Sequence, residues 1–356
     1  NFCAGPAALP DEVLEQLREE IPDWKGKGLS VMEMSHRSKE FVEIAETAKQ
    51  DFIDLLEIDN NYEVLFIQGG ASLQFSMIPM NFLESSQSLC SYLDVGQWSK
   101  KAIKEAKKFG QVEIAASSAE VSYKKYPKPE KWKISPDSKF THLVLNETID
   151  GVSLRNLDDI PEINLVADCS SCILSEPLDV SKFSMLYAGA QKNMGIPGVS
   201  ICIGDEQYLN TENNSKYLNL GQLVEKNSLL NTPPTFSIYI LKLVTDWMIQ
   251  MGGVKYFEEK SIRQSSRLYE QLNSYKDFLL LPVCDYSKSR SNIIFKFENN
   301  ELEKKFLMEA GKKGIIGLNG HRSEGGVRIS LYNSITDEMV DYLSEFIDQF
   351  FVSNGK

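Results

Sequence analysis

Residues 164–203 read NLVADCSSCILSEPLDVSKFSMLYAGAQKNMGIPGVSICI, and the architecture can be inferred outward from this stretch. It contains three apolar runs, each with the length of one buried strand: 164–168, 184–188 and 199–203. Asp168 closes the first run, and Gly-Ala-Gln-Lys at 189–192 follows the second. The carboxyl ends of parallel strands share one edge of a sheet, where ligands bind. We therefore expect a ligand site at these two strand ends.

The same pattern extends toward the N-terminus. Four earlier apolar runs are typical of strands: 63–67, 88–93, 112–116 and 142–146. Amphipathic stretches between them have helical spacing, such as 42–56 and 100–109. Strands that alternate with helices predict the α/β class, with a mostly parallel sheet flanked by helices on both faces.

The pattern changes near residue 254. A helix predicted over 236–251 ends at two glycines, and a long helix follows it. Beyond it we predict short strands at 292–297 and 327–331, and helices at 301–311 and 336–350. These elements predict a smaller C-terminal α+β domain over residues 254–356, joined by residues 1–11. Residues 12–253 then form the large domain, and two domains suit the chain length.

Composition and charge exclude several classes of protein. The 356 residues are 42% hydrophobic and 25% charged, which is typical of a globular chain. The formal net charge of −12 disfavours a nucleic-acid binder. No apolar run reaches about 18 residues, so we expect no membrane span. We also expect no signal peptide, because the first residues lack a basic stretch before an apolar one.

The six cysteines are too sparse for a fold built on disulfides. Cys169 and Cys172 form a single CxxC pair, and a zinc site needs a second pair or two nearby histidines. We therefore expect no metal and a reducing, cytoplasmic compartment. A redox role for the pair stays open beside plain packing at a strand end.

Gly-Gly-Ala-Ser at 69–72 follows the run 63–67 and opens a helix. Glycines let backbone amides approach a ligand, and the positive end of a helix favours an anion. The stretch predicts a phosphate-binding loop, although it is not a Walker A motif because no Gly-Lys-Ser/Thr follows. The alternative is a plain strand-to-helix turn in which Ser72 caps the helix.

Three more residues carry possible chemistry. Asp168 ends a buried strand, where its carboxylate needs a partner such as a protonated ring nitrogen, unless it caps the next helix. Lys192 follows an apolar strand among small residues, so desolvation should lower its pKa and favour imine formation; a surface lysine is the alternative. Trp98 offers a face for stacking on a planar ring, unless it packs in the core.

Only 8 of the 38 basic residues are arginines, and three of them lie near histidines: His36-Arg37, and His321-Arg322 with Arg328 nearby. The guanidinium fork binds carboxylate or phosphate, and an imidazole adds a donor. One such pair would be typical of a surface, whereas two indicate an anion site. An anion loop, a stacking ring, an acid and an imine-forming lysine are together the parts of a pyridoxal phosphate site.

The chain resembles the phosphoserine aminotransferase family, in class V of the fold-type-I pyridoxal phosphate enzymes, nearly end to end. The resemblance rests on specific stretches: NFCAGPAALP at 1–10, SHR at 35–37, GGASLQF at 69–75, NETIDG at 146–151, AGAQKN at 188–193, NTPPT at 231–235 and GHR at 320–322. It implies fold type I and a homodimer with shared active sites.

The resemblance also implies a role for each site residue. Lys192 would hold pyridoxal 5'-phosphate as an internal aldimine and carry the proton, while Asp168 pairs with the ring nitrogen. Trp98 would stack on the ring, and Thr148 would bond near its hydroxyl. The phosphate would be held by Ala71, Ser72 and Gln191, with Asn231 and Thr232 from the second copy. Substrate anions would be bound by Arg328 at the α-carboxylate and by His36, Arg37, His321 and Arg322 at the side chain.

The implied reaction is reversible, ping-pong amino transfer from L-glutamate to 3-phosphooxypyruvate, giving O-phospho-L-serine and 2-oxoglutarate for serine biosynthesis. Both substrates carry two anionic groups, which accounts for the two His-Arg pairs on an acidic chain. A second role in vitamin B6 biosynthesis stays open. Some members carry Arg or Cys at the position of Ser72, so phosphate binding here would have one cation fewer.

Three alternatives remain. A fold-type-I cysteine desulfurase needs a cysteine on a mobile loop; none of the six lies in an obvious one, although Cys169 adjoins Asp168. An aminotransferase of small neutral substrates, of the alanine–glyoxylate type, would not need the two His-Arg pairs. A non-catalytic relative would have no need for Lys192, Asp168 and Trp98 together.

Overall fold

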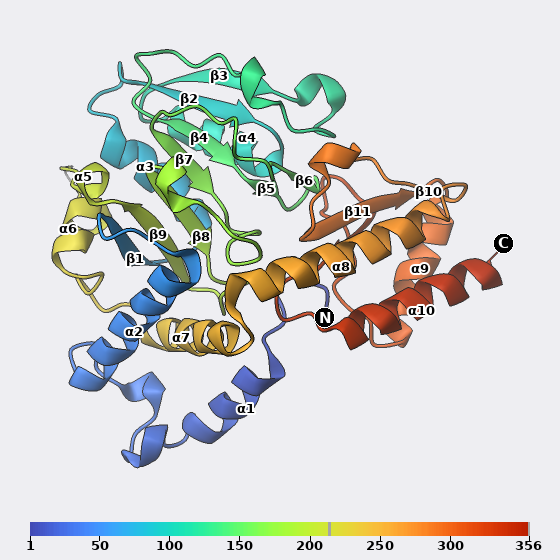
Figure 1. Cartoon of the computed structure of the whole chain (residues 1–356), viewed down its shortest axis with the longest axis horizontal. Coiled ribbons are helices and arrows are strands. Elements are labelled where there is room, and N and C mark those ends of the chain that lie inside the picture. Colours follow the sequence, from blue (N-terminus) through green and yellow to red (C-terminus); the bar gives the residue numbers. More distant parts are fainter. Residues whose placement is uncertain (213–214, 355–356) are drawn as a thin grey trace.

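The computed structural model describes residues 1–212 and 215–354, which form two lobes joined along one long helix (Figure 1). The helices are α1 Asp11–Glu20, α2 Lys39–Leu56, α3 Gln74–Phe82, α4 Gln97–Ala106, α5 Glu206–Leu209, α6 Leu220–Glu225, α7 Thr235–Gln250, α8 Gly253–Asn273, α9 Asn300–Lys312 and α10 Asp337–Ser353. The strands are β1 Tyr62–Gln68, β2 Leu89–Asp94, β3 Gln111–Ser117, β4 Thr141–Val144, β5 Asn146–Glu147, β6 Val152–Ser153, β7 Leu165–Asp168, β8 Met185–Gly189, β9 Val199–Asp205, β10 Leu279–Leu280, β11 Asn292–Phe297 and β12 Val327–Ser330. Each helix or strand predicted from the sequence matches one of these elements, with ends that differ by a few residues at most.

The large lobe is built on a seven-stranded sheet in the order β1-β9-β8-β7-β4-β2-β3. All neighbours pair in parallel except β9, which runs antiparallel to β1 and β8. The expected α/β class with a mostly parallel sheet is therefore confirmed. Because β7 and β8 are parallel neighbours, Asp168 and the segment after Gly189 emerge at the same edge.

Successive side chains of each strand enter two separate cores. On β8, Leu186 and Ala188 pack into a core shared with α2 and α7, whereas Met185 and Tyr187 pack into another shared with α3 and α4. This alternation follows from the two-residue period of a strand covered on both faces. Within the described residues, no helix is both long and apolar enough to cross a bilayer.

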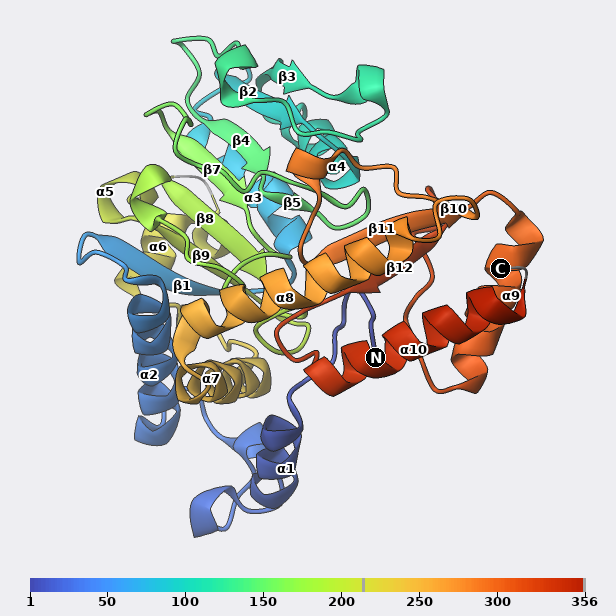
Figure 2. The same cartoon turned by 45° about the vertical axis from the view of Figure 1, so that its right-hand side comes forward.

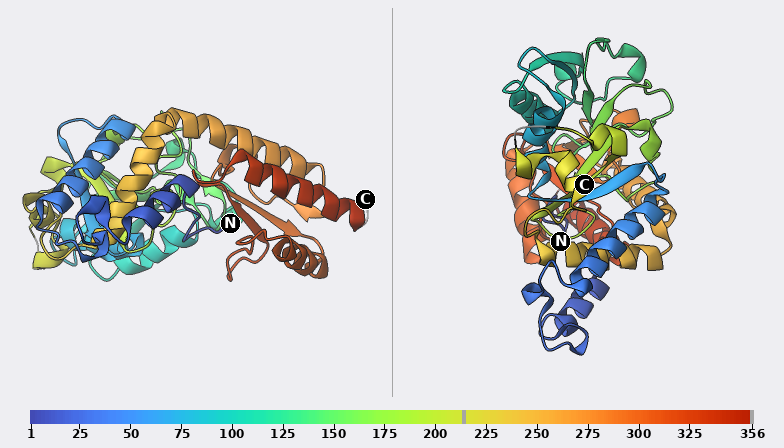
Figure 3. Two further views of the ribbon diagram at one scale, coloured as in Figure 1. Left: turned by 90° about the horizontal axis from the view of Figure 1, so that it is seen from below. Right: turned by 90° about the vertical axis from the view of Figure 1, so that its left-hand side faces the viewer.

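The small lobe joins the antiparallel sheet β10-β11-β12 to α9, α10 and the end of α8 (Figure 2). Seen from below, it forms one end of an elongated molecule (Figure 3). Near its start α8 places Phe257 in the large core, and near its end it places Leu268 in the small one. Phe2 also packs in the small core. The division at residue 254 stays a prediction, since α8 belongs to both cores.

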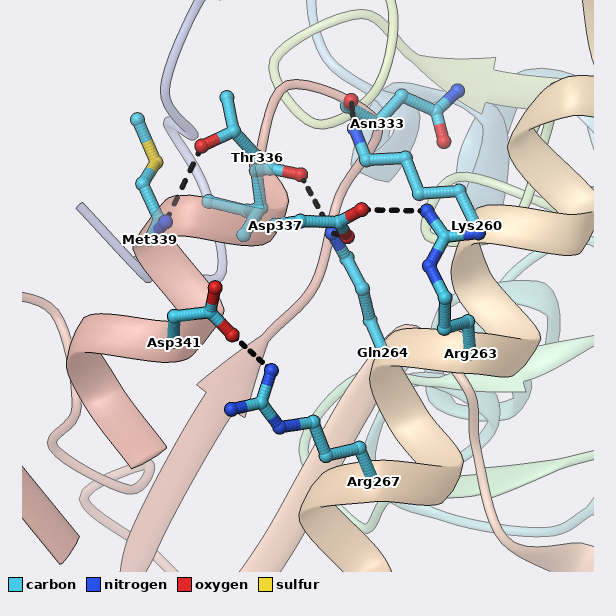
Figure 4. Close-up of polar contacts among 10 residues, drawn as sticks. Lys260, Arg263, Gln264, Arg267, Asn333, Thr336, Asp337, Met339 and Asp341 are labelled. Atoms are coloured by element: carbon cyan, nitrogen blue, oxygen red, sulfur yellow. Dashed lines mark hydrogen bonds and ion pairs between the residues drawn. The ribbon is translucent and has the colours of Figure 1, made fainter. Parts of the chain in front are cut away.

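Polar pairs line the contact between α8 and α10 (Figure 4). Arg263 binds Asp337 at 2.7 Å, and one turn further Arg267 pairs with Asp341. One turn before Arg263, the buried Lys260 donates from Nζ to the Asn333 carbonyl at 2.7 Å. Burial lowers the pKa of this amine to about 8. Helices α8 and α10 are thus joined by ion pairs on their exposed side and by apolar side chains in the core below.

The apolar contacts, not the charges, should carry the stability of this interface. Arg267→Ala is expected to lower the unfolding free energy by roughly 0–1 kcal/mol, because water screens a half-exposed ion pair. Leu268→Ala should cost about 2–5 kcal/mol, because Leu268 is fully buried and its removal leaves a cavity. Urea denaturation followed by circular dichroism measures both. A greater loss for Arg267→Ala would reverse this assignment.

Candidate active site

A pocket opens at the carboxyl edge of the large sheet. Seven residues singled out in the sequence line it: Ala71, Ser72, Trp98, Thr148, Asp168, Gln191 and Lys192. Gly70 of the predicted anion loop also lines it, and four residues that were given no role complete it: Phe75, Val144, Asn146 and Ser170. Segments more than a hundred residues apart therefore converge on one site, as the parallel strand order predicted.

Lys192 lies on the turn after β8, and its amine is taken out of water. Nζ donates to Thr148 Oγ1 at 2.6 Å and lies 5.9 Å from the centroid of the Trp98 ring. Burial lowers the pKa of the amine to about 8, against the opposing effect of the Asp168 charge. The expected desolvation of this lysine is confirmed, and the alternative of a surface lysine is wrong.

The turn that carries Lys192 is held by groups from three other segments. The side chain of Asn193 donates to the Ile173 carbonyl at 2.8 Å and accepts from the Asn333 amide at 3.0 Å. On the preceding residue, the Gln191 carbonyl accepts from the Ala7 amide at 2.9 Å. The N-terminal segment and the small lobe therefore fix the main chain on both sides of the lysine.

Asp168 ends β7 as a buried carboxylate. Its Oδ1 accepts from the Ser170 amide at 2.9 Å within a turn, so the expected alternative of a cap for a following helix is wrong. Burial raises the pKa of Asp168, while the nearby Lys192 charge acts in the opposite direction. A buried carboxylate in this state is stabilised by a cation placed in the pocket.

Two further buried side chains stand behind Asp168. Tyr187 lies opposite Asp168 on β8, and its hydroxyl lowers the pKa of the carboxyl as a hydrogen-bond donor. The same hydroxyl lies 2.8 Å from Nε2 of His142 on β4, and burial lowers the pKa of that imidazole to about 3. His142 is therefore neutral. Neither residue was singled out in the sequence, although the two-residue period of a strand places each on the face of Asp168.

The loop at 69–72 has the expected form. A short 3-10 helix, Ala71–Leu73, follows Gly70 and leads into α3, so the start of a helical segment lines the pocket. The residue before α3 is Leu73, and no side chain caps that helix. The alternative in which Ser72 is the cap is therefore wrong.

The anion-binding set is only partly assembled within one chain. Arg328, on β12, donates from Nη1 to the Thr148 carbonyl at 3.3 Å, so it lies at the pocket rim. Asn231 instead bonds Gln68 at 3.3 Å. The predicted site residues that do not line the pocket of this chain are His36, Arg37, Asn231, Thr232, His321, Arg322 and Arg328. Their roles stay predictions, which for Asn231, Thr232 and some of the histidines and arginines involve a second copy.

A family model described as aminotransferase class-V matches residues 1–343. The chain belongs to this family. A curated class-V relative, the phosphoserine aminotransferase of Hahella chejuensis, is 44% identical over 352 residues, which are 98% of this chain and 97% of that protein.

Solved structures of two other relatives superpose closely on this class-V chain. A phosphoserine aminotransferase from Bacillus circulans subsp. alkalophilus has a TM-score of 0.97 at 40% identity, covering 100% of this chain and 99% of its own. A PLP-bound phosphoserine aminotransferase from Trichomonas vaginalis has a TM-score of 0.92 at 32% identity, covering 98% and 99%. The fold-type-I architecture predicted from the resemblance is therefore confirmed.

The hydrogen bonds that hold the turn around Lys192 should contribute to the unfolding free energy. Asn193→Ala removes two buried hydrogen bonds and leaves the Asn333 amide and the Ile173 carbonyl without them. We expect the unfolding free energy to fall by about 1–3 kcal/mol. Asn164→Ala, which removes two exposed bonds, one to the Lys139 carbonyl and one from the Ser184 hydroxyl, should cost less than about 0.5 kcal/mol. Chemical denaturation compares them, and equal losses would show that the turn is not held in this way.

Proposed function

We propose that this chain is a pyridoxal-phosphate-dependent aminotransferase that transfers the amino group of L-glutamate reversibly to 3-phosphooxypyruvate. The observation that carries the proposal is the convergence of the Lys192 amine, Thr148, Asp168 and Trp98 beside the anion loop at 70–72. Relatives 43–44% identical over nearly the whole chain are phosphoserine aminotransferases, and the Trichomonas vaginalis neighbour is PLP-bound.

The pocket fits pyridoxal phosphate in charge and in shape. Asp168 offers a buried anion to a protonated ring nitrogen, and the loop at 70–72 offers amides to the phosphate. Trp98 provides a flat apolar wall beside the lysine. When bound, this cofactor supplies an aldehyde for covalent attachment and a ring that accepts electrons when the substrate loses its α-proton.

The residues of this chain supply the proton transfer and the exclusion of water. With a pKa lowered to about 8, the Lys192 amine exists in both protonation states near neutral pH, as a group that takes and returns a proton requires. Thr148 Oγ1 holds Nζ at 2.6 Å and so fixes where that proton is exchanged. Phe75 and Val144 complete an apolar lining around it.

The substrate anions are assigned to the arginines. Arg328 at the rim binds the α-carboxylate in this proposal, because it already contacts the main chain of Thr148. The second anion of either substrate is bound by His36, Arg37, His321 and Arg322, and the phosphate of the cofactor also by Asn231 and Thr232. We propose a homodimer with shared sites, in the cytoplasm, in which Asn231, Thr232 and some of these histidines and arginines come from the second copy.

The desulfurase alternative is not favoured by the cysteine nearest the site. Cys169 is buried, and its thiol donates to the Tyr187 carbonyl at 3.2 Å. Burial raises its pKa well above the ordinary value. A thiol in this state is a poor nucleophile, and a sulfur acceptor must be one.

The Lys192 amine should govern the uptake of pyridoxal phosphate. The neutral amine is the nucleophile, so the uptake rate should rise with pH through a midpoint of about 8 instead of 10.5, the value of an ordinary lysine. The visible band that forms should shift on addition of L-glutamate. Stopped-flow absorbance measures the rate, and spectra at equilibrium measure the shift.

Two variants separate this amine from other lysines. Lys192→Ala should form no such band, whereas Lys260→Met should keep it, because the equally depressed amine of Lys260 lies on α8 outside the pocket. A midpoint near 10.5, or a band that survives Lys192→Ala, would falsify the assignment of this lysine.

The two anion positions should be separable by kinetics. Arg328→Lys loses the planar fork at the α-carboxylate, so KM should rise about tenfold for L-glutamate and for 3-phosphooxypyruvate alike. Arg322→Ala should raise KM mainly for substrates with a distal anion and leave L-alanine, a poor substrate without one, unaffected. Steady-state assays of the three substrates measure this. An equal rise for L-alanine with Arg322→Ala would contradict the distal role.

A further inference from the structure

The first amides of α4 are bound by carboxylates from a different segment of the chain. Glu147 accepts from the Trp98 amide at Oε2, at 2.9 Å, and from the Ser99 amide at Oε1, at 2.8 Å. Asp150 Oδ2 accepts from the Gln97 amide at 2.9 Å. A helix start is ordinarily capped by the side chain of the residue before it, which here is Gly96.

Gly96 leaves the space that this arrangement needs. A Cβ at this position would lie 2.5 Å from Cδ of Glu147 and 2.6 Å from Oδ2 of Asp150, closer than carbon atoms approach anything unbonded. The missing side chain therefore both removes the ordinary cap and admits two carboxylates in its place.

The arrangement is costly if its only result is to begin a helix. Glu147 is fully buried, and burial with the neighbouring Asp150 charge raises its pKa to about 8. Burial also raises the pKa of Asp150 to about 6, while Lys100 and Lys296 act against the shift and Glu324 adds to it. A Ser in place of Gly96, with apolar residues in place of the two acids, would cap α4 without burying an acid. Capping α4 therefore does not by itself explain why these two acids are buried here.

That consequence is a rigid link between two walls of the pocket. The two acids flank Thr148, whose hydroxyl accepts from the Lys192 amine, and Glu147 accepts from the main-chain amide of Trp98. The ring wall and the lysine partner are thus set relative to each other through Glu147, across two segments about fifty residues apart.

We propose that Glu147, assisted by Asp150, is a positioning residue that fixes Trp98 relative to Thr148 and so sets the ring wall against the Lys192 amine. The proposal deepens the cofactor site and rests on the proposed function. Neither carboxylate lines the pocket, so both act through the residues they hold.

Glu147→Gln tests the link with little change of shape. The amide has one oxygen for two N–H donors, and its NH2 faces the second donor, so α4 should shift at Trp98. The affinity of the apo protein for pyridoxal phosphate should fall about tenfold, since one buried backbone N–H is left without its acceptor. Glu105→Gln is the matched control: this partly exposed acid lies at the other end of α4, away from the pocket lining, and its replacement should change affinity less than twofold.

A double-mutant cycle separates positioning from plain stability. If Glu147 acts through the ring, Glu147→Gln should lower affinity less than about twofold further in a Trp98→Phe background. If the affinity losses of the two single variants multiply in the double variant, the proposal is overturned, because Glu147 then affects binding independently of the Trp98 ring.

A readout on the apo protein keeps the test independent of the cofactor. The emission of Trp98 is obtained as the difference between the wild type and Trp98→Phe, among four tryptophans. We expect a red shift of this component in Glu147→Gln and none in Glu105→Gln. If the wild type binds no pyridoxal phosphate, the proposed function fails, yet the emission still decides whether Glu147 positions Trp98. An unshifted emission overturns the positioning.

A second variant covers the case in which Glu147→Gln does not fold. Gly96→Ala pushes both carboxylates away from α4 and should give the same red shift and loss of affinity. Gly311→Ala is its control, because nothing lies within 4 Å of the added Cβ on α9. Normal affinity and emission in Gly96→Ala would contradict the link.

Discussion

The removal of the Lys192 amine from water is the constraint on which the rest of the site depends. An amine in water keeps its proton near neutral pH, whereas burial lowers the pKa of this one to about 8. Burial of an amine is unfavourable unless its surroundings are fixed, and here the hydroxyl of Thr148 and the charge of Asp168 offset part of the cost. The turn, the loop and the opposite strand ends must therefore be held in register to fractions of an ångström.

The small lobe takes part in holding that register. Arg328 reaches the Thr148 carbonyl, and the Asn333 amide reaches Asn193 beside the lysine. The N-terminal segment lies between the lobes, where the hydroxyl of Tyr332 donates to the Ala4 carbonyl at 2.9 Å. A displacement of the small lobe would therefore act on Arg328, on Thr148 and on the Lys192 turn together. In the proposed function, in which Arg328 binds the substrate α-carboxylate, this coupling links substrate binding to the amine.

The sequence predicted those features that depend on local pattern. The strand runs and the polar residues at their ends placed Lys192 and Asp168 at one edge, because a parallel order brings such ends together. The role of Thr148, and the choice of stacking over core packing for Trp98, came from the resemblance. The capping role considered for Ser72 was wrong, because the chain passes through a 3-10 turn before α3 begins. Local pattern could not distinguish that turn from a direct helix start.

Features that depend on contacts between distant segments were beyond such reasoning. Glu147 stood inside a quoted motif, yet its bonds go to backbone amides of α4, and a backbone amide carries no sequence signal. The pair of His142 and Tyr187 requires knowledge that β7 lies between β4 and β8. His36 and Asn231 lie outside the pocket of one chain, so their assignment rests on the resemblance and on a second copy that only an assembly can test.

The candidate site has a buried part, in which pKa values are shifted, and an exposed part, in which the arginines stay charged. In the interior, burial tunes groups of modest charge: it depresses the pKa of Lys192, raises that of Glu147 and keeps His142 neutral. Arg37, Arg322 and Arg328 remain partly or fully exposed and keep their charge, which suits their proposed binding of substrates with two anionic groups. The net charge of −12 does not oppose this, because screening confines each charge to about 10 Å at ordinary ionic strength. The local concentration of guanidinium groups, not the sum over the chain, then decides which anions are drawn to the pocket.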